Sequence, residues 1–213
     1  MNPKCNRRGF LSKLAGTACV AGLSGGSWFL ASSGVQGDRQ GLRPPGALDE
    51  ADFLATCIRC GRCADACPNC AIVPFTEEAG AEMSVAPGPG ERGTPVIFAR
   101  KKSCILCSGA SGDSLLCTVA CPSGALQPIK KEAIAIQENV AMGTAKVDKN
   151  ICYSYNGASC GACVRSCPFE GTALRAELWE KPVVDSASCV GCGLCERACI
   201  HYPAAIRVRP RSV

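Results

Sequence analysis

Sixteen of the nineteen cysteines in this 213-residue chain fall into four motifs, each ending in a Cys-x3-Cys step. Thiolates are soft ligands that select iron–sulfur clusters or zinc. The spacing C-x2-C-x2-C-x3-C, followed by proline, is typical of [4Fe–4S] ligands. The motifs are Cys57, Cys60, Cys63 and Cys67 (motif 1); Cys104, Cys107, Cys117 and Cys121 (motif 2); Cys152, Cys160, Cys163 and Cys167 (motif 3); and Cys189, Cys192, Cys195 and Cys199 (motif 4). These residues are predicted to bind four [4Fe–4S] clusters, whose chemistry is electron transfer.

Three motifs depart from the short form. A loop of nine residues, Ser108–Leu116, interrupts motif 2, and one of seven residues, Tyr153–Ser159, interrupts motif 3. Both loops are rich in Gly, Ser or Asn, as turns require. Motif 4 is followed by Ile200 instead of proline. None of these changes removes a ligand.

Two other uses of cysteine fit the sequence less well. Zinc ribbons place two C-x2-C pairs far apart, whereas here three cysteines lie close together before a fourth. A disulfide framework would suit an exported chain. However, nineteen is an odd number, and the cysteines cluster locally. The spacing therefore favours iron–sulfur clusters.

The first 33 residues resemble an export signal. Arg7-Arg8-Gly9-Phe10-Leu11 is a paired arginine followed by x-Phe-Leu, as in twin-arginine signals. The weakly apolar stretch that follows ends in the small residues Ala31-Ser32-Ser33, which predict cleavage near residue 33; an uncleaved anchor is the alternative. This route exports folded proteins, which suits clusters assembled in the cytoplasm. We expect a mature protein that works outside the cytoplasm.

Charge and composition exclude several functions. The net charge is +5, of which residues 1–33 supply +4, so 19 basic and 18 acidic side chains remain elsewhere. Each oxidised cluster with four thiolates carries about −2, so the loaded mature protein would carry about −7. This argues against nucleic-acid binding. The basic tail near Arg211 is either a solvated end or a docking point. With one histidine and complete ligand sets, the chain lacks the groups of an enzyme.

Short apolar runs beside the motifs repeat along the chain and indicate duplication of one module. We expect an α+β, loop-rich fold of duplicated two-cluster bacterial ferredoxin-like modules with short strands and helices. Strands are expected at residues 95–99 and 182–185, a loop at 76–94 and a brief helix at 132–140. The predicted organisation is a twin-arginine signal (1–33), a linker or arm (34–51), a first module with motifs 1 and 2 (52–129), a linker (130–144), and a second module with motifs 3 and 4 and the basic tail (145–213).

Some assignments stay open. In two-cluster ferredoxins the fourth cysteine of each motif binds the other cluster, so motifs act in pairs. Pairing 1 with 2 and 3 with 4 is simplest, but motifs 2 and 3 could pair, and 1 with 4, as in subunits of molybdenum oxidoreductases. Cys70 is either a spare ligand or a small buried side chain. His201 is either a donor to a cluster sulfur or a surface residue.

The stretch Gly41-Leu42-Arg43-Pro44-Pro45-Gly46-Ala47-Leu48, the paired arginine and the interrupted motifs resemble the NapG/MauM-type periplasmic ferredoxin-type proteins of nitrate reduction and methylamine utilisation. The resemblance implies a periplasmic protein attached to the inner membrane through a quinol-oxidising partner similar to a membrane polyferredoxin. Electrons would pass through four clusters to a periplasmic cytochrome or reductase. An iron–sulfur accessory or maturation factor is the alternative. The pathway, whether nitrate, methylamine or another, stays open.

Overall fold

The computed structural model describes residues 41–211, so the predicted export signal lies outside the described residues. Short helices and strands separated by turns confirm the loop-rich α+β class. The helices are α2 (Glu50–Thr56), α3 (Arg62–Asp65), α4 (Glu77–Ala81), α5 (Leu116–Val119), α6 (Ala133–Asn139), α7 (Ala162–Arg165) and α8 (Leu194–Ala198), with 3-10 turns η1 (Tyr153–Tyr155) and η2 (Leu178–Glu180). The strands are β1 (Ile72–Pro74), β2 (Pro95–Ile97), β3 (Thr144–Val147), β4 (Leu174–Glu177), β5 (Lys181–Val184) and β6 (Ile206–Arg209).

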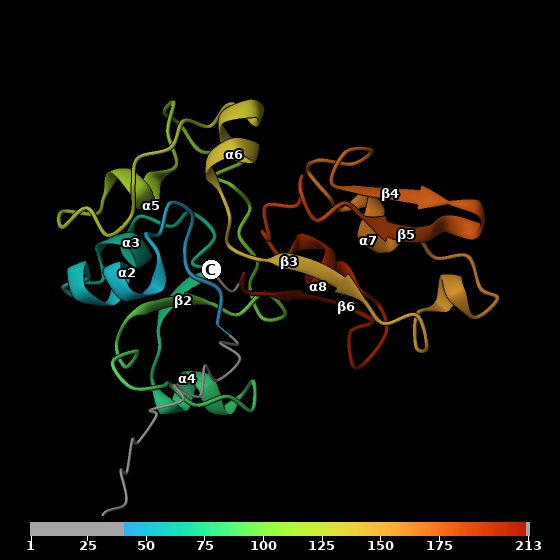
Figure 1. The fold of residues 1–213 in the computed structure, drawn as a ribbon, viewed down its shortest axis with the longest axis horizontal. Coiled ribbons are helices and arrows are strands. Elements are labelled where there is room, and N and C mark those ends of the chain that lie inside the picture. The colour runs from blue at the N-terminus through green and yellow to red at the C-terminus, as the bar shows by residue number, and fades with distance from the viewer. Residues whose placement is uncertain (1–40, 212–213) are drawn as a thin grey trace, which may run out of the picture. The chain divides into compact units, whose positions relative to one another are not determined.

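The strands form three antiparallel pairs, β1 with β2, β3 with β6, and β4 with β5. Strand β2 lies within the run at residues 95–99 expected to form a strand before motif 2. Strand β5 overlaps the run at residues 182–185 expected to form a strand before motif 4. Figure 1 shows β3 beside β6 and the hairpin of β4 and β5. The register of Val147 opposite Ile206 joins the two ends of the second module. Motifs 3 and 4 therefore lie between a terminal sheet and an internal hairpin.

The described part of the predicted arm packs against the first module. Leu42 and Ile97 exchange backbone hydrogen bonds of 3.1 and 2.8 Å. Further along, the N–H of Gln127 donates to the carbonyl oxygen of Gly46 at 2.7 Å. Gly46 has φ +74, and a Cβ there would lie 2.4 Å from the carbonyl oxygen of Gln127, so glycine is required. The arm thus holds the end of the first module as β3 holds the end of the second.

The expectation of a plain loop at residues 76–94 is wrong, because α4 begins there. The hydroxyl of Thr76 accepts a 3.2 Å hydrogen bond from the N–H of Ala79, and two glutamates occupy the first turn. This is a complete helix start, since the cap satisfies a free N–H and the acidic groups favour the helix N-terminus. Nearby, Phe75 and Phe98 pack edge to face with centroids 5.7 Å apart. The brief helix expected in the linker is present as α6.

One hydrophobic cluster runs through both modules. It includes Phe53 and Leu115, both fully buried, together with buried cysteines of all four motifs. Because thiols make up part of the core, the stability of the fold depends on what these cysteines bind. None of the helices among residues 41–211 combines the length and apolar character that crossing a bilayer requires.

Candidate iron–sulfur sites

Four pockets in the described part of the chain are each lined by four cysteines. In every pocket, three cysteines come from one motif and the last comes from a different motif. Site I has Cys57, Cys60, Cys63 and Cys121; site II has Cys104, Cys107, Cys117 and Cys67; site III has Cys152, Cys160, Cys163 and Cys199; and site IV has Cys189, Cys192, Cys195 and Cys167. All sixteen predicted ligands occur once, and no pocket is left with an incomplete set.

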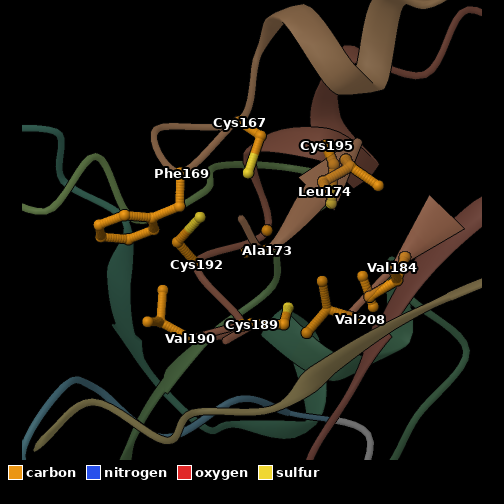
Figure 2. Close-up of a pocket in the computed structure, with 13 residues that line it drawn as sticks. Cys167, Phe169, Ala173, Leu174, Val184, Cys189, Val190, Cys192, Cys195 and Val208 are labelled. Carbon is orange, nitrogen blue, oxygen red and sulfur yellow. The ribbon is translucent and has the colours of Figure 1, made fainter. Parts of the chain in front are cut away.

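The exchange of the fourth cysteine defines how the motifs pair. Cys67 and Cys121 exchange between motifs 1 and 2, and Cys167 and Cys199 exchange between motifs 3 and 4. The structure therefore has the simpler of the two pairings left open by the sequence. Figure 2 shows site IV, where the side chain of Cys167 points toward the same space as those of Cys189, Cys192 and Cys195.

Short helices carry the third cysteine of each motif into its site. Cys63 lies in α3, Cys117 in α5, Cys163 in α7 and Cys195 in α8. Helices α3 and α8 begin after a glycine in the left-handed conformation, Gly61 with φ +78 and Gly193 with φ +83. Only glycine adopts this conformation without strain, so it turns the chain sharply between the second and third cysteines.

The inserted loop of motif 2 is tied down so that its ligands still converge. The N–H of Lys131 donates to the carbonyl oxygen of Asp113 at 2.9 Å, and its ammonium group donates to that of Ala110 at 2.5 Å. At the end of the loop, the N–H of Leu116 donates to the thiol of Cys107 at 3.4 Å. The loop therefore returns the chain to the site from which it departs.

The inserted loop of motif 3 is held by different contacts. The side-chain amide of Asn156 donates to the carbonyl oxygen of Cys152 at 2.8 Å. The hydroxyl of Tyr155 donates to the carbonyl oxygen of Pro182 in β5 at 3.2 Å. These bonds fix η1 between the first two cysteines, so that Cys152 and Cys160 line the same pocket despite the insertion.

Burial makes these thiols poor acids in the absence of a cation. It raises the pKa of Cys117 and Cys192 to about 12, and repulsion from neighbouring cysteines adds to the rise. Burial likewise raises the pKa of Cys63 and Cys163 to about 11. Four thiolates cannot share such an apolar space unless positive charge compensates them. Iron ions provide that charge, and the donor set fits an iron–sulfur cluster.

Several of the predicted ligand thiols accept hydrogen bonds from backbone N–H groups. Backbone N–H groups donate from Ala71 to Cys67, from Leu106 to Cys104 and from Leu116 to Cys107, each at 3.4 Å, and from Ala205 to Cys199 at 3.3 Å. At Cys121, burial raises the pKa, but hydrogen bonds from Leu126 and Ser123 outweigh it and hold the pKa below its ordinary value. Such bonds stabilise the charged sulfur and tune the reduction potential of a bound cluster.

Among residues 41–211, no three histidine, cysteine, aspartate or glutamate side chains converge closely enough to hold one metal ion.

Comparisons with known proteins agree with this geometry. A family model described as a 4Fe-4S dicluster domain matches residues 158–202, and one described as a 4Fe-4S binding domain matches residues 54–73. The chain is 38% identical over 212 residues to the methylamine utilization ferredoxin-type protein MauM of Paracoccus denitrificans, covering 95% of this chain and 85% of that protein. The chain belongs to the MauM and NapG ferredoxin-type proteins.

Two NapG proteins illustrate the second branch of this MauM/NapG family. The ferredoxin-type protein NapG of Haemophilus influenzae is 36% identical to this chain, and the alignment covers 100% of this chain and 74% of NapG. NapG of Escherichia coli is 33% identical, and the alignment covers 99% of this chain and 88% of that NapG. The dicluster match contains all of motif 4 and most of motif 3, the two motifs that pair in the structure. Thus the chain carries 4Fe-4S binding domains, as the motifs predict.

The stretch that carries the family resemblance includes Arg43, whose side chain is buried and holds several parts of the first module together. The Arg43 side chain is only 4% exposed and lies 4.8 Å from the ring centroid of Phe53. It donates to the carboxylate of Glu50 and to the hydroxyl of Thr94 at 2.7 Å. Arg43 thereby joins the arm to α2 and to Thr94, the residue directly before β2.

Two residues with open roles lie in distinct places. Cys70 is exposed, with φ +45, and belongs to none of the four sets of thiols. The prediction of a small buried side chain is therefore wrong in its burial, because the turn after Pro68 points Cys70 outward. His201 lines site III, with Nδ1 2.8 Å from the carbonyl oxygen of Pro203. Cys5 and Cys19 lie outside the described residues.

Sequence reasoning missed the amide donors at Ala71 and Ala205. Both are small residues that follow the fourth cysteine of a motif. Ala71 lies four positions after Cys67, and Ala205 lies six positions after Cys199. A small residue there lets the backbone approach the sulfur closely. This recurrence was visible in the sequence, but motif spacing alone does not indicate which N–H group faces the thiol.

Proposed function

We propose that the protein is an electron carrier that binds one [4Fe–4S] cluster in each of sites I to IV. The single observation that supports this most strongly is the complete set of four thiols in every pocket, with the fourth cysteine exchanged between paired motifs. The clusters supply one-electron reduction and oxidation. The chain holds their thiolates, excludes water and directs N–H groups toward sulfur.

The absence of an open ligand position separates a carrier from an enzyme. A catalytic iron site needs a coordination position for substrate, whereas each proposed cluster here has four cysteine ligands. The potentials would be set by burial and by the amide donors at residues such as Ala71 and Ala205. The protein's part in the reaction is therefore to accept one electron and pass it on.

The proposed place of action is the periplasm, reached in folded form through the twin-arginine signal around Arg7 and Arg8. The proposed electron donor is a membrane partner that oxidises quinol, and the acceptor is a periplasmic cytochrome or redox enzyme. The names of the relatives, a methylamine utilization ferredoxin-type protein and a ferredoxin-type protein, support a role in electron transfer. Association with the inner membrane would come through the donor.

An anaerobic redox titration followed by EPR tests the carrier function. We expect all four clusters to take up one electron each and to return it on reoxidation. Clusters that stay EPR-silent down to the potential of dithionite, or that fall apart on reduction, would contradict the carrier function. That outcome would favour the accessory or maturation role, in which clusters serve structure.

A further inference from the structure

Within each module, the two sites meet through packed helices. Helix α3 packs against α5, which brings Cys63 of site I toward Cys117 of site II. Helix α7 packs against α8, which brings Cys163 of site III toward Cys195 of site IV. The exchange of fourth cysteines reinforces both contacts. Each module thus contains two neighbouring sites.

Between the modules, a direct backbone contact joins a ligand of site II to a ligand of site IV. The backbone N–H of Cys104 donates a 2.9 Å hydrogen bond to the carbonyl oxygen of Cys192. Both residues are ligands in the proposed clusters, Cys104 in site II and Cys192 in site IV. One backbone hydrogen bond therefore connects a ligand of the first module to a ligand of the second.

Other contacts hold this junction closed. A guanidinium nitrogen of Arg100 donates to the carbonyl oxygens of Glu196 and Cys199, both at 2.8 Å. Arg197 in turn donates to the carbonyl oxygen of Lys101. The segment before Cys104 and the segment after Cys192 thus donate hydrogen bonds to each other in both directions. Ser103 beside Cys104 is fully buried at the same place.

We propose that electrons cross between the modules at Cys104 and Cys192, so that the electron path runs in the order site I, site II, site IV, site III. This inference rests on the proposed function. In the crossing step, site II loses one electron and site IV gains it, or the reverse, with no bond made or broken. Tunnelling rates fall steeply with distance, so a direct hydrogen bond between ligands of the two modules favours transfer there. The spatial order differs from the order of the motifs in the chain.

Burial of the sites agrees with this order. Sites II and IV each contain two buried cysteines, Cys107 and Cys117 in one and Cys192 and Cys195 in the other. Sites I and III contain one each, and Cys60 of site I is exposed. The inner sites are thus shielded, and the outer sites are open to external partners.

The junction offers a matched pair of glycine variants. A Cβ at Gly193 would lie 2.4 Å from the Cβ of Ala99, across the junction. A Cβ at Gly61 would meet no atom within 4 Å, although its φ of +78 is close to the +83 of Gly193. Gly193→Ala and Gly61→Ala therefore impose similar backbone strain, and only the first pushes the modules apart. Adding Ala99→Gly makes room for the new methyl group.

The test compares these variants of the full cluster-loaded chain by pulsed dipolar EPR of reduced samples and by hydrogen exchange of the Cys104 amide. We expect three coupled neighbour pairs in the unaltered protein. Gly193→Ala should lose the coupling between sites II and IV and the protection of the amide. Gly61→Ala should keep both, and Ala99→Gly combined with Gly193→Ala should restore both.

Unchanged coupling and protection in Gly193→Ala would overturn the junction, as would a loss that Ala99→Gly fails to restore. If Gly193→Ala loses iron, restoration of iron and coupling together by Ala99→Gly supports the junction, and failure of restoration refutes it. Four clusters with only the two couplings inside modules would refute the junction and leave the carrier function standing. Absence of clusters from sites II and IV in the unaltered protein would refute both.

Discussion

Cys121, the last cysteine of motif 2, lines site I together with Cys57, the first cysteine of motif 1. The two residues are separated by most of the first module, yet they belong to one donor set. The module is therefore closed by its own ligands, because neither motif can complete a cluster alone. This arrangement makes each cluster a cross-link between distant segments.

The exchange predicts which substitutions act on the same cluster. Cys121→Ser and Cys57→Ser should alter the same component of the reduced EPR spectrum, the one from site I. Cys117→Ser should alter a different component, because Cys117 lines site II. Cys70→Ser is the matched control, since this exposed cysteine lies outside the four sets. A shared effect of Cys121→Ser and Cys117→Ser, separate from that of Cys57→Ser, would disprove the exchange.

Arg43 should contribute strongly to stability. Its guanidinium, 4% exposed, pairs with Glu50, and Arg43→Ala would leave the partly buried carboxylate of Glu50 without this cation. We expect a loss of about 3–5 kcal/mol in the free energy of unfolding. Arg43→Lys should recover only part of this, because an ammonium cannot make the forked contact. Arg92→Ala, at an exposed pair with Glu77, is the control and should cost at most about 1 kcal/mol.

These effects can be measured as shifts of the midpoint temperature in anaerobic thermal unfolding. For a chain of this size, about 1 kcal/mol corresponds to about 2–4 °C. Equal shifts for Arg43→Ala and Arg92→Ala would show that the arm does not stabilise the first module.

Glu196 predicts a pH dependence. Burial raises its pKa, although its carboxylate accepts a 2.7 Å hydrogen bond from the N–H of Val208. A raised pKa means that the contribution to stability is fully present below the unfolded-state pKa and is lost as the pH rises through the folded-state pKa. Glu196→Gln keeps an acceptor without the charge, so it should be at least as stable as the unaltered protein at pH 7. The difference in the free energy of unfolding between the two proteins should shrink as the pH is lowered.

Glu196→Ala serves as the contrasting variant, because it removes the acceptor of the Val208 N–H group. It should cost about 1–3 kcal/mol. Thermal unfolding at neutral and mildly acidic pH checks both variants. A Glu196→Gln protein that is clearly less stable than the unaltered one at pH 7 would contradict a burial cost at this carboxylate.

Export is predicted to depend on the paired arginines. Replacing Arg7 and Arg8 by lysine keeps the positive charge but removes the twin-arginine signal. We expect the loaded protein to accumulate in the cytoplasm, as measured by fractionation and immunoblotting. Lys4→Arg is the control and should leave export unchanged. Periplasmic protein at normal levels after the double replacement would refute this route.

Local patterns in the sequence predict the ligands and the strands beside them, because a cluster is bound by closely spaced cysteines and short strands follow apolar runs. They predict that Cys67 joins the cluster of another motif but leave open whether that is motif 2 or motif 4, because the pairing depends on how the motifs pack. The contact of Cys104 with Cys192 joins residues far apart in the chain and has no local signal. Helix α4 is not predicted, because the many glycine and proline residues of the segment indicate a loop more strongly than the N-cap at Thr76 indicates a helix.

The most direct test of the central claim is the content of iron and acid-labile sulfide per chain in anaerobically purified protein, with EPR of the dithionite-reduced sample. We predict about sixteen of each per chain and a spectrum of interacting reduced clusters, as four cubanes with four cysteine ligands each require. A content of about eight of each, or zinc in place of iron, would contradict an electron carrier with four clusters.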